Sequence, residues 1–256
     1  MRCAVVTGAS RSAGIAAAVA LALARDGWDV LTSGLPAHDA REGWSSEPDE
    51  VVTAVRATGV RAAWHEDDLA DPAAPARILD AAERELGRPT ALVACHAHSE
   101  SGGVLDTDAA QLDRHLDANA RGTILLVQEL VRRLEGSGRV VVFTSNPPLA
   151  GEIAYAASKG ALEWFVRSAA VELGPRGVTI NAIDPGPTDT GWMTDELRDA
   201  VARRTPLGGA GDPGDSASLA AFLCSDAAGR ITGEVIHADG GFSLVGAAPR
   251  FGRDRA

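Results

Sequence analysis

The sequence is nearly devoid of two residue types, lysine and tyrosine. Its 256 residues include 24 basic side chains, yet Lys159 is the single lysine and Tyr155 the single tyrosine. Cysteine is scarce as well, since Cys3, Cys95 and Cys224 are the complete set and lie far apart in apolar segments. A sparse, odd set of cysteines is typical of reduced thiols and argues against a disulfide-stapled fold.

The sequence also lacks a basic run, an apolar run of membrane-spanning length and a leader-like start. Acidic residues (35) outnumber basic ones (24), which gives a net charge of −11, whereas nucleic-acid binding needs a cationic surface. No apolar stretch approaches the roughly 20 residues of a transmembrane helix, and the chain begins with a strand-like run rather than a signal peptide. We therefore expect a cytoplasmic protein with no nucleic-acid or membrane partner.

Short apolar runs alternate with helix-like segments along the whole chain. This alternation predicts an α/β fold, a single Rossmann-type domain over residues 1–256 with a doubly wound parallel sheet of about seven strands and helices on both faces. The expected strands are 2–7, 29–32, 60–65, 91–95, 139–144, 178–183 and 234–238. The expected helices are 15–25, 49–58, 73–86, 109–134 with a break, 155–173 and 215–223.

Two long connections interrupt the alternation. Residues 35–48 form a polar connection, and residues 185–214 form the longest irregular stretch. Folds of this class carry substrate loops after their strands, so we predict a substrate loop or lid over 185–214. The polar tail 249–256 is expected to be mobile.

Two segments, 124–134 and 161–173, are apolar almost all round. A sheet covers only one face of a helix, so a second apolar face indicates either a partner subunit or a wider contact within the monomer. We expect a homo-oligomer, a dimer or a tetramer, formed through helices 121–134 and 155–173.

A glycine-containing turn follows the first expected strand, in the order Thr7-Gly8-Ala9-Ser10-Arg11-Ser12-Ala13-Gly14-Ile15-Ala16. Glycine lets backbone amides approach a pyrophosphate, which binds at the positive end of the following helix. A third glycine is missing, because Ala16 stands in its place, so a turn without a ligand is the alternative. We expect Gly8, Ser10, Arg11, Gly14 and Ile15 to bind a dinucleotide.

The end of the second expected strand, around Ser33, has no carboxylate to bind the adenosine ribose and repel a 2′-phosphate. Arg11 in the glycine turn offers a guanidinium that can pair with that phosphate, unless it is merely solvated. These residues predict NADP(H) in preference to NAD(H). After the third strand, Asp68 and Leu69 are expected to border the adenine, the alternative for Asp68 being a helix cap.

Tyr155 and Lys159, the two rare residues, lie four apart at the start of an expected helix and so share one of its faces. An ammonium beside a phenol favours the phenolate, so we expect Lys159 to lower the pKa of Tyr155. A tyrosine with such a pKa is a usable general acid or base near neutral pH.

With these motifs in this order, the sequence resembles the short-chain dehydrogenase/reductase family. The likeness runs from the glycine turn through Tyr155-x-x-x-Lys159 to Asp184-Pro185-Gly186-Pro187-Thr188-Asp189-Thr190 and the closing 231–241 segment. It resembles a branch with a T-G-x-S-R-x-x-G-I-G-like turn. The resemblance implies that a tyrosine exchanges the substrate proton, a lysine holds the nicotinamide ribose, a serine binds the substrate oxygen and an asparagine holds a relay water. Those roles fall on Tyr155, Lys159, Ser145 (or Thr144) and Asn119.

The resemblance also implies that Pro185, Gly186, Thr188 and Thr190 contact the cofactor. The chain departs from the family pattern at three points: Ser145 is only ten residues before Tyr155, the glycine turn is two residues longer, and Ala94-Cys95-His96-Ala97 replaces an asparagine-rich segment. Ala97 is small enough for close cofactor approach. Asn119 falls inside an expected helix, where asparagine is unfavourable, so a kink or relay is expected there.

Cys95, His96 and His98 resemble a zinc-ligand cluster, but neighbouring strand residues face opposite ways and no fourth ligand is evident. We therefore expect no metal; His96 is expected in the core and His98 at the substrate mouth, with Asn146, Trp192 and Met193. The predicted function is an NADP(H)-dependent oxidoreductase acting on a small ketone or secondary alcohol. The alternatives are epimerase-, dehydratase- or dehalogenase-like chemistry on the same fold, and a non-catalytic dinucleotide sensor.

Overall fold

The computed structural model describes residues 2–145 and 150–245. Its strands are mostly apolar runs, buried except at the two edges, and form a parallel sheet in the order β3-β2-β1-β4-β5-β6-β7. The predicted doubly wound Rossmann-type sheet is confirmed. The strands are β1 Arg2–Thr7, β2 Trp28–Gly34, β3 Ala62–Glu66, β4 Ala91–Ala94, β5 Gly138–Phe143, β6 Val178–Asp184 and β7 Val235–His237.

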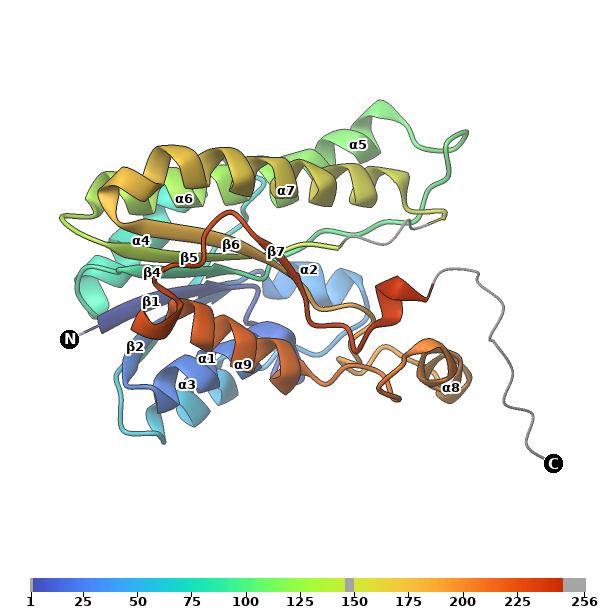
Figure 1. The fold of residues 1–256 in the computed structure, drawn as a ribbon, viewed down its shortest axis with the longest axis horizontal. Helices are drawn as coiled ribbons and strands as arrows, with labels where there is room; N and C mark the ends of the chain where they lie inside the picture. The colour runs from blue at the N-terminus through green and yellow to red at the C-terminus, as the bar shows by residue number, and fades with distance from the viewer. Residues whose placement is uncertain (1, 146–149, 246–256) are drawn as a thin grey trace.

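Helices cover both faces of this sheet (Figure 1). One apolar core lies between the sheet and α4, α6 and α7, and a second lies between the sheet and α1, α3 and α9. The α-helices are α1 Ile15–Arg25, α2 Pro36–Arg41, α3 Pro48–Arg56, α4 Ala74–Glu85, α5 Ala109–His115, α6 Gly122–Arg133, α7 Ile153–Leu173, α8 Asp195–Arg204 and α9 Pro213–Cys224. Short 3-10 turns are η2 Gly174–Arg176, η3 Asp226–Ala228 and η4 Phe242–Leu244.

Strand order reverses between β1 and β4, whose neighbours continue in opposite directions. In open sheets of this kind the ligand crevice lies outside the carboxyl ends of the strands at this switch point. Helices α5 and α8 extend past that end of the sheet, with α8 in the connection after β6 (Figure 1). The fold therefore places the glycine turn and the predicted lid at one end.

Two predicted connections contain helices that the sequence analysis missed. α2 begins at Pro36 within 35–48, and α8 within 185–214 is capped by Thr194, whose hydroxyl accepts the Leu197 amide. Both helices are short and polar, so they lack the apolar periodicity by which helices are recognised. The lid prediction therefore falls on a segment with an ordered helix, and the tail 249–256 lies outside the described residues.

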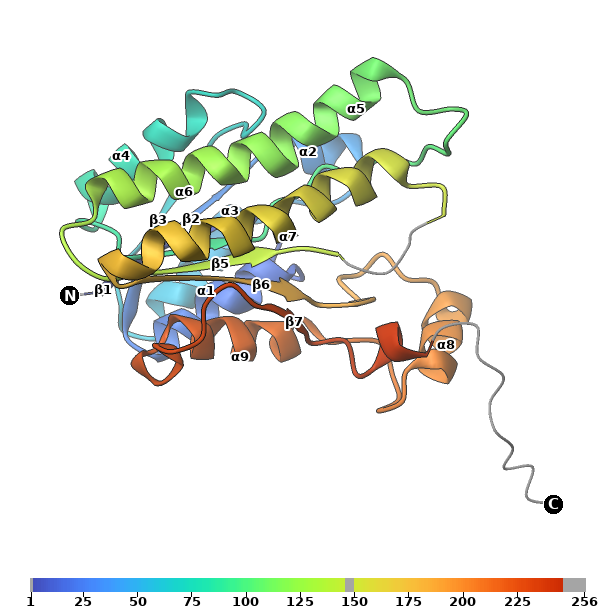
Figure 2. The ribbon, with the colours of Figure 1, turned by 45° about the horizontal axis from the view of Figure 1, so that its top comes forward.

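The expected break in 109–134 takes the form of a π-helical turn, η1 Leu116–Arg121, between α5 and α6. Figure 2 shows the three segments as one long rod beside α7. π-helical turns inside α-helices are rare and occur frequently at functional sites. Asn119 lies in this turn and is fully buried.

α6 and α7 differ in how they cover their apolar surfaces. α6 packs against α4 as well as the sheet, so much of its second apolar face is covered within the monomer. α7 instead exposes Trp164 (71%) and Val171 (78%) on its outer face. Among the described residues, no helix combines the length and apolar character needed to span a bilayer.

Candidate active site

The turn between β1 and α1 forms a cradle at the carboxyl end of the central strand. Gly8 has φ +80°, and a Cβ there would lie 2.8 Å from backbone atoms of His96, which follows β4. Gly14 is the N-cap residue that precedes α1, and its amide donates to the Arg11 carbonyl at 3.1 Å. A side chain at residue 8 would fill this space, and the amides at the start of α1 are suited to a phosphate. The cradle fits a dinucleotide cofactor.

α2 lies against this turn through two contacts. The buried carboxylate of Asp39 accepts a hydrogen bond from the buried Ser10 hydroxyl. Arg11 stacks at 4.3 Å on the ring of Trp44, just beyond α2, and donates to the Thr190 carbonyl at 2.8 Å. The alternative of a merely solvated Arg11 is therefore wrong. Asp39 is not among the predicted site residues, because a ribose-binding carboxylate is expected at the end of β2.

Among the other residues predicted to bind the cofactor, Ser33 and Ile15 lie at this turn. The buried Ser33 accepts the Ala9 amide through its carbonyl at 2.9 Å, and Ile15 is the first residue of α1. Ala97 is exposed after β4, while Leu69 is buried. Asp68 accepts the Ala70 amide at 2.9 Å, so its carboxylate stabilises a turn before α4.

The expected core position of His96 is wrong, because the residue is only half-buried, although both of its ring nitrogens are hydrogen-bonded. Its Nε2 lies 3.2 Å from the Ala118 carbonyl, so that nitrogen carries the proton, and its Nδ1 accepts from the Thr7 hydroxyl at 2.7 Å. Burial, aided by the Lys159 charge, lowers the pKa of His96 to about 3, so the ring is neutral.

Within the described part of the chain, the one group with metal-ligand spacing is Asp184, His237 and Asp239, and Cys95, His96 and His98 do not form such a group. His237 Nδ1 already bonds Asp184 at 3.0 Å, and Asp239 accepts backbone amides. These hydrogen bonds account for the positions of the three side chains.

The first turns of α7 place Tyr155 and Lys159 against the end of β5. The Lys159 ammonium is buried, donates to the Phe143 carbonyl at 3.0 Å, and lies 5.7 Å from the centre of the Tyr155 ring. Ser158 is fully buried and donates to the Tyr155 carbonyl at 2.7 Å. The helix therefore fixes both rare residues on one side, next to the sheet.

Asn119 connects this helix to the segment after β4. Its Nδ2 donates to Ser158 Oγ and to the His98 carbonyl, both at 2.9 Å, and its Oδ1 accepts the His98 amide at 2.6 Å. Ser158 is not among the predicted site residues, although its place between Tyr155 and Lys159 in the motif indicates a position at the site. Its hydroxyl links α7 to the π-helical turn through hydrogen bonds.

The expected effect of Lys159 on Tyr155 is not what the structure gives. Burial raises the pKa of Tyr155, and the carboxylates of Glu152 and Asp184 raise it further. Burial also lowers the pKa of Lys159 to about 8. Desolvation outweighs attraction here because both groups are enclosed by the sheet and α7. Tyr155 is therefore a protonated phenol at neutral pH.

Thr144 and Ser145, the two candidates for binding the substrate oxygen, differ in position. The buried Thr144 hydroxyl donates to the Lys159 carbonyl at 3.1 Å, so it is engaged with the α7 backbone. Ser145 follows it and is half-buried. Asn146, a predicted substrate residue, lies outside the described residues.

The conformation of the loop after β6 is fixed by a close backbone approach and by hydrogen bonds to its own carbonyl groups. Gly186 has φ +61°, and a Cβ there would lie 2.4 Å from Asp239 Cβ. Thr188 is buried and donates to the Pro185 carbonyl at 3.2 Å. Trp192 is half-exposed and donates to the Thr188 carbonyl at 2.9 Å.

Met193 is buried in a small apolar cluster with Val201 and Phe242. This position makes Met193 a packing residue of the predicted lid. α8, which carries Val201, is attached to the loop through the same cluster.

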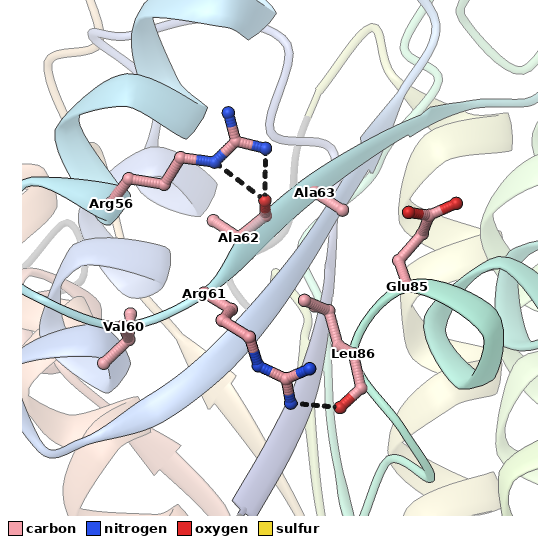
Figure 3. A pocket seen from close by; sticks show the side chains of 7 residues that line it. All are labelled: Arg56, Val60, Arg61, Ala62, Ala63, Glu85 and Leu86. Atoms are coloured by element: carbon pink, nitrogen blue, oxygen red, sulfur yellow. Dashed lines mark hydrogen bonds between the residues drawn. The ribbon is translucent and has the colours of Figure 1, made fainter.

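A surface hollow lies elsewhere, between β3 and the ends of α3 and α4 (Figure 3). Arg56 donates to the Ala62 carbonyl at 2.7 Å and Arg61 to the Leu86 carbonyl at 2.5 Å. These guanidinium groups join helices to β3, at the opposite end of the sheet from Tyr155.

Comparisons with known proteins agree with this geometry. The family model described as enoyl-(acyl carrier protein) reductase matches residues 8–243. The uncharacterized oxidoreductase YjdA of Bacillus subtilis is 40% identical over 246 residues, covering 93% of this chain and 96% of that protein. The chain belongs to the short-chain dehydrogenase/reductase family.

Solved structures of this family superpose over almost the whole chain. A short-chain dehydrogenase/reductase from Serratia marcescens has a TM-score of 0.84 and 32% identity, covering 94% of this chain and 98% of its own. A short-chain dehydrogenase from Burkholderia cenocepacia, solved in complex with NADP, has a TM-score of 0.83 and 34% identity, covering 93% and 96%. As a member of this family, the chain is an oxidoreductase that uses a nicotinamide cofactor.

Proposed function

We propose that this enzyme is an NADP(H)-dependent oxidoreductase that interconverts a small-molecule ketone and a secondary alcohol, with Tyr155 as general acid or base. The observation that carries the proposal is the hydrogen-bonded chain from Tyr155 through Ser158 to Asn119, beside the buried Lys159. Burying an ammonium costs free energy, and a role at the cofactor and the phenol explains why one is held here.

Tyr155, Ser145 and Lys159 have separate tasks in the proposed reaction. In the direction of reduction, the protonated phenol of Tyr155 gives its proton to the oxygen of the substrate, and Ser145 polarises that oxygen. Lys159 holds the nicotinamide ribose and favours the phenolate left behind. The bound nicotinamide supplies the hydride in reduction and accepts it in oxidation. Positioning and electrostatic stabilisation provide most of the rate effect.

Two groups of residues hold the cofactor. The turn residues Gly8, Ser10, Arg11 and Gly14 hold its phosphates, with Arg11 at the 2′-phosphate. The Asp39 carboxylate next to Ser10 opposes a 2′-phosphate and reduces the preference for NADP(H), which the Arg11 guanidinium maintains. Further contacts come from Ile15, Ser33, Asp68, Leu69, Ala97, Pro185, Gly186, Thr188 and Thr190.

We also propose that the enzyme acts as a homo-oligomer in the cytoplasm. The outer face of α7, with Trp164 and Val171 exposed, supports a subunit contact through α6 and α7. The three cysteines are free thiols, which suits a reducing compartment. His98 and Trp192 are expected to contact the substrate.

The Tyr155→Phe variant tests the proposed reaction. Removing the hydroxyl leaves packing intact and takes away the proton, so turnover in ketone reduction falls by a factor on the order of 10² or more. Affinity for NADPH, measured by quenching of the five tryptophans, stays unchanged. Turnover near that of the wild type would refute the role of Tyr155, and failure of the wild type to bind either NADPH or NADH would refute the cofactor assignment.

A further inference from the structure

A cluster of side chains between β4 and α5 surrounds His98, one of the residues expected to contact the substrate. The ring of His98 lies 5.6 Å from that of His38 on α2 and 4.7 Å from that of His115 on α5, measured between ring centres. Glu100 joins the cluster, with its Oε1 2.9 Å from His98 Nε2. Arg114 donates to both oxygens of Glu100, at 2.9 and 2.7 Å.

Arg114 fixes the charge of Glu100, and Glu100 in turn fixes the tautomer of His98. The two hydrogen bonds from Arg114, with its charge, lower the pKa of Glu100 to about 2, so Glu100 is a carboxylate. A carboxylate only accepts hydrogen bonds, so Nε2 of His98 carries a hydrogen. Burial and the neighbouring His115 lower the pKa of His98 below its usual range. In neutral His98, Nδ1 is therefore a hydrogen-bond acceptor.

His115, the next ring in the row, has both nitrogens engaged. Its Nε2 accepts the Glu100 amide at 3.0 Å, its Nδ1 donates to the Gln111 carbonyl at 2.8 Å, and it is fully buried. It fills the space between His98 and Tyr155, whose ring centre is 6.5 Å away. His98 keeps 17% of its side chain exposed, so a ligand can reach it.

The backbone of His98 is fixed to the reaction centre. Asn119 bonds both the amide and the carbonyl of His98 and also bonds Ser158, next to Tyr155 in the hydrogen-bonded chain. A residue whose backbone and ring are both held by hydrogen bonds has a fixed position relative to the substrate, which a specificity residue requires. The ring centres of His98 and His115 are 4.7 Å apart and those of His115 and Tyr155 are 6.5 Å apart. His98 therefore lies within the length of one small molecule from Tyr155.

We propose that His98, oriented by Glu100 and Arg114, accepts a hydrogen bond from a hydroxyl group of the substrate. The inference rests on the proposed ketone reduction and specifies its substrate class, an uncharged hydroxy-ketone or the matching diol. Glu100 and Arg114 cancel each other's charge, and a neutral His98 adds none, so the cluster attracts neither a carboxylate nor an amine. Glu100 and Arg114 are positioning residues, because they act through His98.

Cyclohexanone and its 2-, 3- and 4-hydroxy derivatives test this proposal, because the ring holds the hydroxyl at three defined distances from the carbonyl. With NADPH and the wild-type enzyme, at least one hydroxy-ketone is expected to exceed cyclohexanone in kcat/KM by about tenfold, the effect of one good hydrogen bond. His98→Leu brings that ratio close to 1. Equal kcat/KM for all four ketones, or a ratio unchanged in His98→Leu, overturns the proposal.

Variants of the positioning residues separate orientation from folding. Glu100→Ala and Arg114→Ala lower the ratio, whereas Glu100→Gln keeps an oxygen for Nε2–H and retains most of it. Arg132→Ala is the matched control, since Arg132 pairs with Glu129 on the surface of α6, and it leaves the ratio unchanged. A wild-type enzyme that reduces none of the four ketones contradicts the proposed function itself, an outcome distinct from reduction without preference.

The tautomer can be measured without any activity. Nitrogen-15 NMR of histidine-labelled protein at pH 7, with the His98 signals assigned through His98→Leu, is expected to show hydrogen on Nε2 and a lone pair on Nδ1. Glu100→Ala is expected to mix the two tautomers. A His98 that is doubly protonated, or that carries its hydrogen on Nδ1, overturns the proposal even if ketones are reduced.

Discussion

Arginines fasten neighbouring segments at both ends of the sheet, but only the carboxyl end holds a buried lysine. At the amino ends of the strands, Arg2 donates to the Asp26 carbonyl and stacks on Trp28, and Arg61 pairs with Asp29. Those guanidinium groups are largely exposed or half-exposed and fasten one element to the next. At the carboxyl ends the single lysine is buried. A surface contact would not require this burial.

Glycines show the same difference. Gly27, before β2, has φ +79° and a Cβ there would meet no atom of the described residues within 4 Å, whereas Gly8, after β1, has φ +80° and backbone atoms at 2.8 Å. The first glycine serves only the turn. Gly8 also allows two backbone segments to approach closely. The position of a glycine in the sheet, rather than its residue type, therefore separates structural from functional roles.

Gly8→Ala against Gly27→Ala gives the largest expected contrast. Both variants carry the cost of a positive φ, about 1 to 2 kcal/mol, but only Gly8→Ala forces a Cβ into the backbone of His96. We expect Gly8→Ala to lower the free energy of unfolding by on the order of 3 kcal/mol and to weaken NADPH binding at least tenfold. Denaturant titration and tryptophan quenching measure the two effects.

The Gly27→Ala control should lose only about 1 kcal/mol and keep its cofactor affinity. Equal losses in the two variants would show that the close approach after β1 has no energetic consequence, and the contrast between the ends of the sheet would disappear.

Lys159→Met tests the free-energy cost of burying the lysine, which is on the order of 3 kcal/mol. Folding lowers the pKa of Lys159 from 10.5 to about 8, so the folded state binds this proton more weakly than the unfolded state. The charged form therefore destabilises the fold fully below pH 8, and the penalty disappears as pH rises from 8 to 10.5. The variant is expected to be more stable than the wild type at pH 7 and to lose that advantage by pH 10.

Chemical denaturation of both proteins between pH 7 and 10 measures this difference, while ketone reduction should be lost in the variant. A stability difference that does not change with pH would mean that Lys159 has an ordinary pKa in the folded state. That result would remove the free-energy argument for its function.

Residue patterns in the sequence predict the part of the site around Tyr155 better than the part around Asp39. The sheet, the Tyr155–Lys159 face and the break at Asn119 depend on local periodicity and propensity, which a single sequence contains. Asp39 and Trp44 depend on a short polar helix that folds back onto the turn. Such a helix has no apolar stripe, so its contacts are set by tertiary packing.

The pKa of Tyr155 departs from expectation for a related reason. Spacing along a helix shows that Lys159 lies near Tyr155, but it does not show that both are enclosed. Desolvation depends on every element that covers a group, here the sheet and α7, and the Glu152 and Asp184 carboxylates act in the same direction. Proximity can be predicted from sequence, whereas burial of this kind comes from the assembled fold.

Arg11→Ala against Arg2→Ala provides the smallest and most specific contrast. Each arginine stacks on a tryptophan, at 4.3 and 4.8 Å, and donates to a backbone carbonyl at 2.8 Å, so the two truncations remove similar contacts at opposite ends of the sheet. Only Arg11 is expected to meet a 2′-phosphate. Arg11→Ala should weaken NADPH binding about tenfold, equivalent to about 1.4 kcal/mol, and leave NADH binding almost unchanged.

Asp39, whose carboxylate is bonded to Ser10, allows a test of the opposite effect on the preference between NADPH and NADH. Asp39→Asn keeps an oxygen to accept the Ser10 hydrogen bond and removes the negative charge beside the glycine turn, so NADPH binding should strengthen severalfold relative to NADH. Titration of both cofactors into Arg11→Ala, Arg2→Ala and Asp39→Asn completes the test. If Arg2→Ala changed the cofactor ratio as much as Arg11→Ala, the effect would come from lost packing. If Asp39→Asn favoured NADH, the carboxylate would not face the 2′ position, and the NADP(H) preference would need a different cation.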